Sequence, residues 1–231
     1  MFNAQVRRVL AAAFAGIMVW GPPAPQTERH DKDSWSTKQY VQIRIFNLAH
    51  VAKRDLFRAE GEVSRIFAGA EIEVNWAEGG LDDTASLVTD FSANNSSPAG
   101  CKAAGYGHEL RLQLLAHAPP GVSPQTLGYS LPCAAFGIDS TIFIDSCEGV
   151  TYQVPASFSK VLAYAMAHEL GHVLLRSSEH TQTGLMRAQW DKTAWRRAMV
   201  RGIPIDGEQA RRMRTELARM QSLPAKKLPG K

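Results

Sequence analysis

Cysteine is scarce in this sequence, with three residues among 231, which excludes a small domain held together mainly by disulfides. The three residues, Cys101, Cys133 and Cys147, still allow one bridge in an oxidising compartment. Cys133 and Cys147 flank a predicted strand pair, and this makes them the preferred partners. Three unpaired thiols are the alternative.

The sequence also lacks an apolar run long enough for a permanent membrane anchor. The run from Val9 to Trp20 is too short to span a bilayer comfortably. It is preceded by Arg7 and Arg8 and followed by a proline-rich stretch, which is the outline of a secretory signal peptide. We therefore expect a signal peptide over residues 1–24, a linker over 25–37, and a secreted or periplasmic protein with no stable membrane span.

Most of the chain has no net positive charge, although the formal net charge of the whole sequence is +4. Residues 1–186 carry a net charge of −4 and residues 187–231 a net charge of +8, which includes a basic tail at 223–231. The body of the chain therefore lacks the basic footprint of a nucleic-acid-binding protein. We expect no nucleic-acid partner, and the sequence carries no signal for the oligomeric state.

Hydrophobic periodicity divides the chain into short strands and longer helices. Strands are expected at 41–45, 72–76, 110–114, 126–130 and 140–145. Helices are expected at 52–69, 159–175 and 210–220, the last after Asp206–Gln209, which resembles a capping box. The first strand–helix–strand unit implies a right-handed crossover between parallel neighbours. These elements predict an α+β domain over 38–222 with a mixed, twisted sheet of about five strands.

The predicted helix at 159–175 contains His168-Glu169-Leu170-Gly171-His172, an H-E-x-x-H pattern. Histidines four residues apart lie one helical turn apart on the same face, so both imidazoles can reach one tetrahedral metal ion. Glu169 shares that side of the helix, which is where a general base for water activation is needed. Two helix histidines satisfied by ordinary hydrogen bonds are the alternative interpretation.

A catalytic zinc usually has three protein ligands and one open position, so a third ligand is expected downstream. The candidates are Glu179, His180 and Glu208. His180 is preferred because residues 176–178 can end the helix and let the chain turn back beneath the metal. Six residues after His180 stands Met186, at the end of a Gly-Leu-Met sequence.

These features resemble the metzincin clan of zinc endopeptidases: H-E-L-G-H, a third histidine shortly after the helix, and a methionine in the following turn. Metzincins typically have glycine and the third histidine at the positions of Leu175 and Ser178, so the third histidine here comes two residues late. The stretch from His168 to Met186 is similar to a group of bacterial matrixin-like metallopeptidases that share this longer spacing. The likeness extends over most of the chain after residue 38.

The resemblance implies a zincin-like fold with an N-terminal lobe at 38–172 and a mainly helical C-terminal lobe at 173–222. One helix is expected behind the sheet and the active-site helix in front. One zinc ion would be held by three histidines, with a methionine beneath it: His168, His172, His180 and Met186. An edge strand would bind substrate through Leu127, Gly128, Tyr129 and Ser130. A metal-binding tyrosine, which some metzincins have two residues after the methionine, is not expected because Ala188 occupies that position.

We predict a secreted zinc endopeptidase that acts on peptides or proteins, with Glu169 as the general base. A zinc amidase acting on cell-wall peptides or other amides is one alternative, because the motif describes water activation and does not select the acyl group. A non-catalytic secreted zinc-binding protein is the other.

The remaining residues with metal-binding or aromatic side chains have structural interpretations. Four histidines without ligand spacing are expected at the surface: His30, His50, His108 and His117. Trp190 and Trp195 are expected to pack beneath the active-site helix. The weakly periodic segment between Ala77 and His108 is expected to be a loop that contributes pocket walls.

Overall fold

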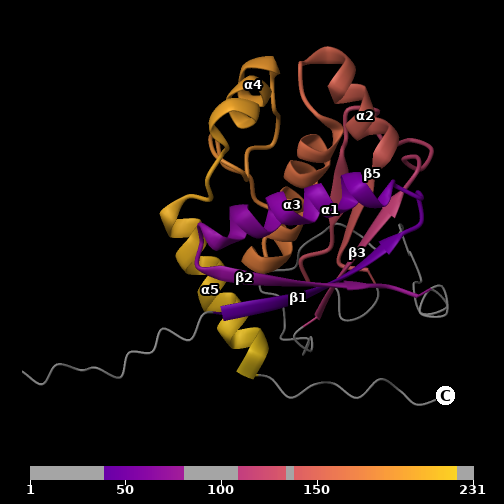
Figure 1. Cartoon of the computed structure of the whole chain (residues 1–231). Coiled ribbons are helices and arrows are strands. Elements are labelled where there is room, and N and C mark those ends of the chain that lie inside the picture. Colours follow the sequence, from indigo (N-terminus) through magenta and orange to yellow (C-terminus); the bar gives the residue numbers. More distant parts are fainter. Residues whose placement is uncertain (1–38, 81–108, 134–137, 223–231) are drawn as a thin grey trace, which may run out of the picture. The chain divides into compact units, whose positions relative to one another are not determined.

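The computed structural model describes residues 39–80, 109–133 and 138–222, and Figure 1 labels its helices and strands. The strands are β1 (Gln39–Asn47), β2 (Ile72–Glu78), β3 (Glu109–Leu115), β4 (Gly128–Ser130) and β5 (Ser140–Phe143). The helices are α1 (Lys53–Ala68), α2 (Ile144–Gln153), α3 (Phe158–Leu175), α4 (Lys192–Arg201) and α5 (Gly207–Ser222). Several predictions fall outside the described residues: the signal peptide, the linker, most of the 77–108 loop, the basic tail, His30, Cys101 and His108.

The five strands form one mixed sheet in the order β2-β1-β3-β5-β4. β1 pairs in parallel with both β2 and β3, β3 pairs in parallel with β5, and β4 is antiparallel to β5 at the edge of the sheet. The α+β class, the five-stranded mixed sheet, the parallel β1–α1–β2 unit and the short edge strand are therefore confirmed.

Most of the buried apolar side chains of the sheet lie on one face. Along β1, the side chains of Val41, Ile43 and Ile45 are buried and alternate with the polar residues Gln42 and Arg44. The same alternation in β3 buries three leucines on that face. An alternating strand offers a single face to a hydrophobic core, so α1 and α3 pack side by side against it (Figure 1). The expectation of one helix behind the sheet and one in front is therefore wrong.

A buried carboxyl lies immediately before β5. The Asp139 side chain accepts a hydrogen bond at Oδ2 from the backbone N–H of Arg111, at 2.7 Å, and Asp139 is 2% exposed. Its other oxygen has no hydrogen-bond partner within the part of the chain that the structure describes. Burial raises the pKa of Asp139 to about 7, and the hydrogen bond from Arg111 opposes this rise. The folded protein therefore keeps the Asp139 proton at pH values where the unfolded chain has lost it.

Substitution of Asp139 by asparagine should remove this pH dependence. Between about pH 4 and pH 7 only the unfolded chain releases the proton of Asp139. Each rise of one pH unit in this range therefore shifts the folding equilibrium toward the unfolded state by up to about tenfold. This shift levels off above about pH 7. Asparagine keeps an oxygen for the Arg111 N–H and carries no charge. Urea unfolding at pH 5 and pH 8 should therefore show a smaller fall in stability for Asp139→Asn than for the wild type. Equal falls in the two proteins would contradict the assignment.

The strand predicted at 140–145 is shorter than expected. β5 ends at Phe143, and α2, which the sequence analysis did not predict, begins at Ile144. Ile144 and Cys147 are both buried and stand three residues apart, which is helical spacing. Ile144, the last apolar residue of the predicted strand, therefore belongs to the buried side of α2.

The predicted disulfide between Cys133 and Cys147 is wrong. Cys133 is disulfide-bonded, but Cys147 is a buried free thiol. In the antiparallel pair, Ser130 of β4 lies opposite Ser140 at the start of β5. Cys133 follows Ser130 and Cys147 follows the end of β5, so the two cysteines lie beyond opposite ends of the strand pair. Flanking a hairpin-like pair in sequence therefore does not bring these two residues together.

The two tryptophans pack against the first half of α3, as predicted. The ring centroids of Trp190 and Trp195 lie 5.3 Å and 6.4 Å from that of Tyr164. The Tyr164 hydroxyl donates to the carbonyl of Ala198 and accepts from the N–H of Ile203, both at 3.2 Å. This cluster attaches α4, a second helix that the sequence analysis did not predict, to the helix that carries the metal-binding motif.

Helix α5 begins with half of the predicted capping box. Asp206 Oδ1 accepts hydrogen bonds from the backbone N–H groups of Glu208, at 2.9 Å, and Gln209, at 3.4 Å. The reciprocal contact does not form, because Oε1 of Gln209 is buried without a hydrogen-bond partner in the described residues. The apolar side of α5, with Met213 and Leu217 buried, packs against α3.

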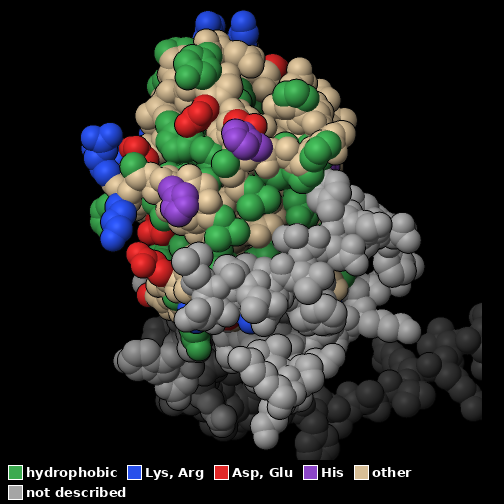
Figure 2. Space-filling view, turned by 90° about the vertical axis from the view of Figure 1, so that its right-hand side faces the viewer, with side chains coloured by type: hydrophobic (Ala, Val, Ile, Leu, Met, Phe, Trp, Pro, Cys, Tyr) green, Lys and Arg blue, Asp and Glu red, His purple; other side chains and the backbone are tan. Residues whose placement is uncertain are grey.

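One face of the molecule carries few cationic side chains among the described residues (Figure 2). Figure 2 shows one face of the molecule on which hydrophobic and acidic side chains gather with two histidines, while the described Lys and Arg side chains lie mainly at the margins. Among the described residues, no helix is both long and apolar enough to cross a membrane.

Candidate metal centre

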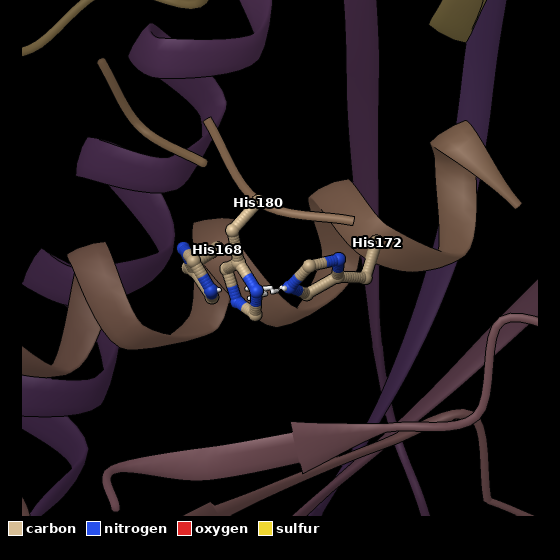
Figure 3. A group of neighbouring side chains, drawn as sticks. All are labelled: His168, His172 and His180. Atoms are coloured by element: carbon tan, nitrogen blue, oxygen red, sulfur yellow. Dashed lines mark hydrogen bonds between the residues drawn. The ribbon is translucent and has the colours of Figure 1, made fainter. Parts of the chain in front are cut away.

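The H-E-x-x-H motif lies in the second half of α3, a helix that is buried along nearly its whole length. His168 and His172 stand one turn apart and point to the same side (Figure 3). Between them, Gly171 leaves room for a neighbour, since an added Cβ would lie 2.6 Å from Sδ and 3.2 Å from Cε of Met186. Met186 is fully buried in this position. The glycine of the motif therefore lets the segment after the helix pack directly against it.

Substitution of Gly171 by alanine should destabilise the protein by about 1–3 kcal/mol, because the buried Met186 side chain must shift to admit the methyl group. Gly61 of α1 provides a matched control. An added Cβ at Gly61 meets nothing within 4 Å, so Gly61→Ala should stabilise the protein by about 0.5–1 kcal/mol through helix propensity. Urea unfolding of both variants tests this difference. A Gly171→Ala protein as stable as Gly61→Ala would show that Met186 does not constrain the motif.

The chain reverses direction at the end of α3. Arg176 adopts the left-handed conformation, with φ of 49°, and its backbone N–H donates to the carbonyl of Val173. The N–H of Ser177 donates to the carbonyl of His172, which completes a Schellman motif. Leu175, at the position where metzincins typically have glycine, is still helical. The helix therefore ends at Leu175 and the chain turns at Arg176, four residues before His180.

Three imidazoles converge where the chain returns (Figure 3). The Nε2 atom of His172 lies 3.1 Å from Nε2 of His168 and 3.2 Å from Nε2 of His180. Among the described residues, these three form the one group whose ligand atoms lie close enough to hold a metal ion. Two nitrogen ligands at about 2.0–2.1 Å from a tetrahedral zinc ion are about 3.3 Å apart, so the observed separations fit zinc.

Hydrogen bonds at the Nδ1 atoms of His168 and His172 determine whether their Nε2 atoms carry a proton or a lone pair. His168 donates from Nδ1 to the carbonyl of Leu185, and His172 donates from Nδ1 to the carbonyl of Ser177, both at 2.8 Å. A neutral imidazole that donates from Nδ1 has a lone pair at Nε2. Two lone pairs therefore face each other at 3.1 Å, an arrangement that repels without a cation between them and binds one well.

The same surroundings keep the histidines neutral. Burial, together with the neighbouring rings of His168 and His180, lowers the pKa of His172 to about 4, and the hydrogen bond to Ser177 opposes this fall. Burial also lowers the pKa of His168 and of His180. Neutral imidazoles are the metal-binding form, so the group is ready to bind a cation at neutral pH.

Glu169 is buried on the side of α3 that faces β4. A Cβ added to Gly128 would lie 3.1 Å from Cγ of Glu169, and the Ser130 side chain hydrogen-bonds the Glu169 carboxyl. Burial raises the pKa of Glu169 to about 7, and the hydrogen bond from Ser130 opposes the rise. A carboxyl with this pKa exchanges its proton near neutral pH, as a general base must.

The segment that contains Met186 forms a tight turn below the histidines. The backbone N–H of Thr181 donates to the carbonyl of Met186 at 2.9 Å, and Gly184 supplies a positive φ of 79°. The carbonyl of Leu185, the residue before Met186, accepts the hydrogen bond from His168. One turn thus presses Met186 against α3 and orients the first histidine.

The edge strand β4 lies beside Glu169 and has no strand partner on its outer side among the described residues. The carbonyl of Leu127 accepts from the N–H of Phe143, which anchors the start of the strand to β5. The Tyr129 ring contacts Phe143, with centroids 6.0 Å apart. Gly128 is buried between the strand pair and α3. Of the four residues predicted to border the substrate, Gly128 and Ser130 therefore lie against the helix that carries the histidines, whereas the Tyr129 ring packs with Phe143.

The other candidate ligands do not join the histidine group in the described part of the chain. Glu179 is exposed, and Glu208 lies 3.7 Å from Arg211 on α5. His50 and His117 are exposed, as predicted for histidines without ligand spacing. Ala188 is also exposed.

Two features of the site were not predicted. For the Ser130 hydroxyl, the one signal in the sequence was that residues two apart in a strand share a face, which puts Ser130 on the same face as Gly128. The reversal of the chain was expected at 176–178, but the left-handed conformation of Arg176 had no signal in the sequence, because arginine seldom adopts it.

Comparisons with known proteins leave the family open. No protein-family model and no curated protein sequence matches the chain. One similar solved structure is a zinc-dependent peptidase from Methanocorpusculum labreanum (strain Z), with 15% identity, coverage of 76% of this chain and 99% of that chain, and a TM-score of 0.41. Another is the GM1-bound form of the ECX AB5 holotoxin, with 11% identity, coverage of 79% and 80%, and a TM-score of 0.38. At these values neither likeness supports a function, so the functional argument rests on the site.

Proposed function

We propose that this chain is a zinc-dependent endopeptidase of the metzincin type, similar to the bacterial matrixin-like metallopeptidases. The observation that carries the proposal is the convergence of three histidine Nε2 atoms beside a buried carboxyl, that of Glu169. A structural zinc site closes with four protein ligands, whereas a catalytic one keeps a position open. The described residues supply three ligands, which favours catalysis over a purely structural zinc.

Each residue of the group has a distinct task. His168, His172 and His180 would hold zinc through Nε2, and the carbonyls of Leu185 and Ser177 keep the first two rings in the correct orientation. Zinc in this position supplies a Lewis acid that polarises a peptide carbonyl and makes water easier to deprotonate. Glu169 accepts a proton from the attacking water at its carboxyl oxygen and passes it to the nitrogen of the leaving amine.

The substrate is a peptide or protein in an extended conformation. The outer edge of β4, at Leu127, Gly128 and Tyr129, would pair with it antiparallel through backbone hydrogen bonds. This placement is supported by the closeness of β4 to Glu169, because a peptide aligned on the strand brings its backbone to the general base. The peptidase domain spans 38–222, with the active site between lobes 38–172 and 173–222.

Export completes the proposal. Residues 1–24 have the outline of a signal peptide, so the enzyme would act outside the cytoplasm and without a retained membrane anchor. Its disulfide-bonded Cys133 fits an oxidising compartment.

Digestion of a diverse peptide mixture by the purified protein tests the activity. We expect internal cleavages with the zinc-loaded protein, none after chelation, and recovery when zinc is restored. Purified cell wall and small amides serve as parallel substrates. Cleavage of those alone would replace the endopeptidase with an amidase, and a zinc-loaded protein that hydrolyses none of the three would contradict an enzymatic role.

A further inference from the structure

The face of β4 that packs against α3 contacts the side chain of Glu169 at two points. In the antiparallel pair, Gly128 and Ser130 lie opposite Ile142 and Ser140, so these residues share the face of the sheet that packs against α3. Gly128 presents bare backbone to Cγ of Glu169, where an added Cβ would be 3.1 Å away. Ser130, two residues on, presents its hydroxyl to the carboxyl.

Close contact at both ends limits how the Glu169 side chain can rotate. Its Cγ abuts Gly128, and its carboxyl is hydrogen-bonded to Ser130, while Glu169 itself is only 8% exposed. A carboxylate is an effective base only when its oxygen points at the proton that it takes. A hydroxyl that donates to one carboxyl oxygen leaves the other oxygen available to accept a proton from water.

We propose that Ser130 is a positioning residue, whose hydroxyl holds the carboxyl of Glu169 in the orientation required for proton transfer. This inference rests on the proposed peptidase function. It assigns a catalytic consequence to a side chain of the edge strand, whereas substrate pairing uses only the backbone of that strand.

Ser140 provides a matched control. It lies directly across from Ser130 on the same face, its hydroxyl is buried, and Oγ has no hydrogen-bond partner in the described residues. Removal of this hydroxyl changes the same sheet face without removing a contact to Glu169.

The experiment compares Ser130→Ala, Ser130→Thr, Ser130→Val and Ser140→Ala, each in the wild type and in a Glu169→Gln background. Zinc content and thermal unfolding are measured on every variant. We expect Ser130→Ala and Ser130→Val to lower kcat about tenfold with KM changed less than about twofold, since one hydrogen bond to a charged group is lost. Ser130→Thr, which keeps the hydroxyl in the shape of valine, should recover most of the rate, and Ser140→Ala should match the wild type.

The Glu169→Gln background separates positioning from a structural effect. If Ser130 acts through the carboxylate, its removal should change the residual single-turnover rate of Glu169→Gln by less than about twofold. A tenfold loss in both backgrounds, a rise in KM with kcat unchanged, or full activity of Ser130→Ala would overturn the inference and leave the peptidase intact. A wild-type protein that hydrolyses no peptide would overturn both.

Discussion

Substitution of Glu169 by glutamine should lower peptide hydrolysis by about 10²–10⁴-fold while the protein retains its zinc. Glutamine has nearly the same shape but cannot accept the proton of the attacking water, and a positioned general base contributes a factor of this size. Zinc binding should persist because Glu169 faces β4 and is not one of the three residues whose nitrogens converge. Steady-state kinetics on a peptide substrate, with zinc content measured on the same sample, test both parts.

The matched control for this variant is Glu179→Gln. Glu179 is an exposed carboxylate beside the third histidine in sequence, and it is not part of the histidine group. Its substitution should leave both rate and zinc content unchanged. Loss of zinc from Glu169→Gln would make Glu169 a ligand, and wild-type activity in that variant would remove it from the mechanism.

The parts of the site that were predictable from the sequence depend on regular geometry. The helical repeat places residues i and i+4 on one face of a helix. The side chains of His168 and His172 must therefore lie next to each other if α3 forms. Strand alternation in β1 similarly marks one apolar face. That pattern was sufficient to place both helices on the same side of the sheet, and the contrary prediction overlooked it.

The parts that were not predictable depend on single turns. The reversal after α3 was expected at 176–178 and favoured His180 as the third ligand, but the left-handed conformation of Arg176 that makes it was not, because arginine rarely adopts it. The boundary between β5 and α2 falls within one apolar run, where Ile144 suits either element. The pairing expected for Cys147 failed for a related reason, because the orientation of β4 against β5 decides which flanking residues meet.

The three histidines should not contribute equally to zinc affinity. His172 is 4% exposed, its Nδ1 donates to Ser177, and its Nε2 lies within 3.2 Å of both other rings. His180 is exposed, and no hydrogen bond to its Nδ1 is present in the described residues. Hydrogen-bond partners that orient ligand histidines are worth about 10–100-fold in metal affinity.

We therefore expect His172→Ala to lose both zinc and activity, and His180→Ala to bind zinc about 10–100-fold more tightly than His172→Ala while still falling below the wild type. Competition with a chromophoric chelator measures the affinities. His117→Ala, which removes an exposed histidine outside the group, should bind zinc as the wild type does. If His180→Ala also kept wild-type affinity, the third ligand would have to be another residue. Loss of equal size in both variants would instead mean that the metal itself, more than the hydrogen bond to Ser177, holds the rings in place.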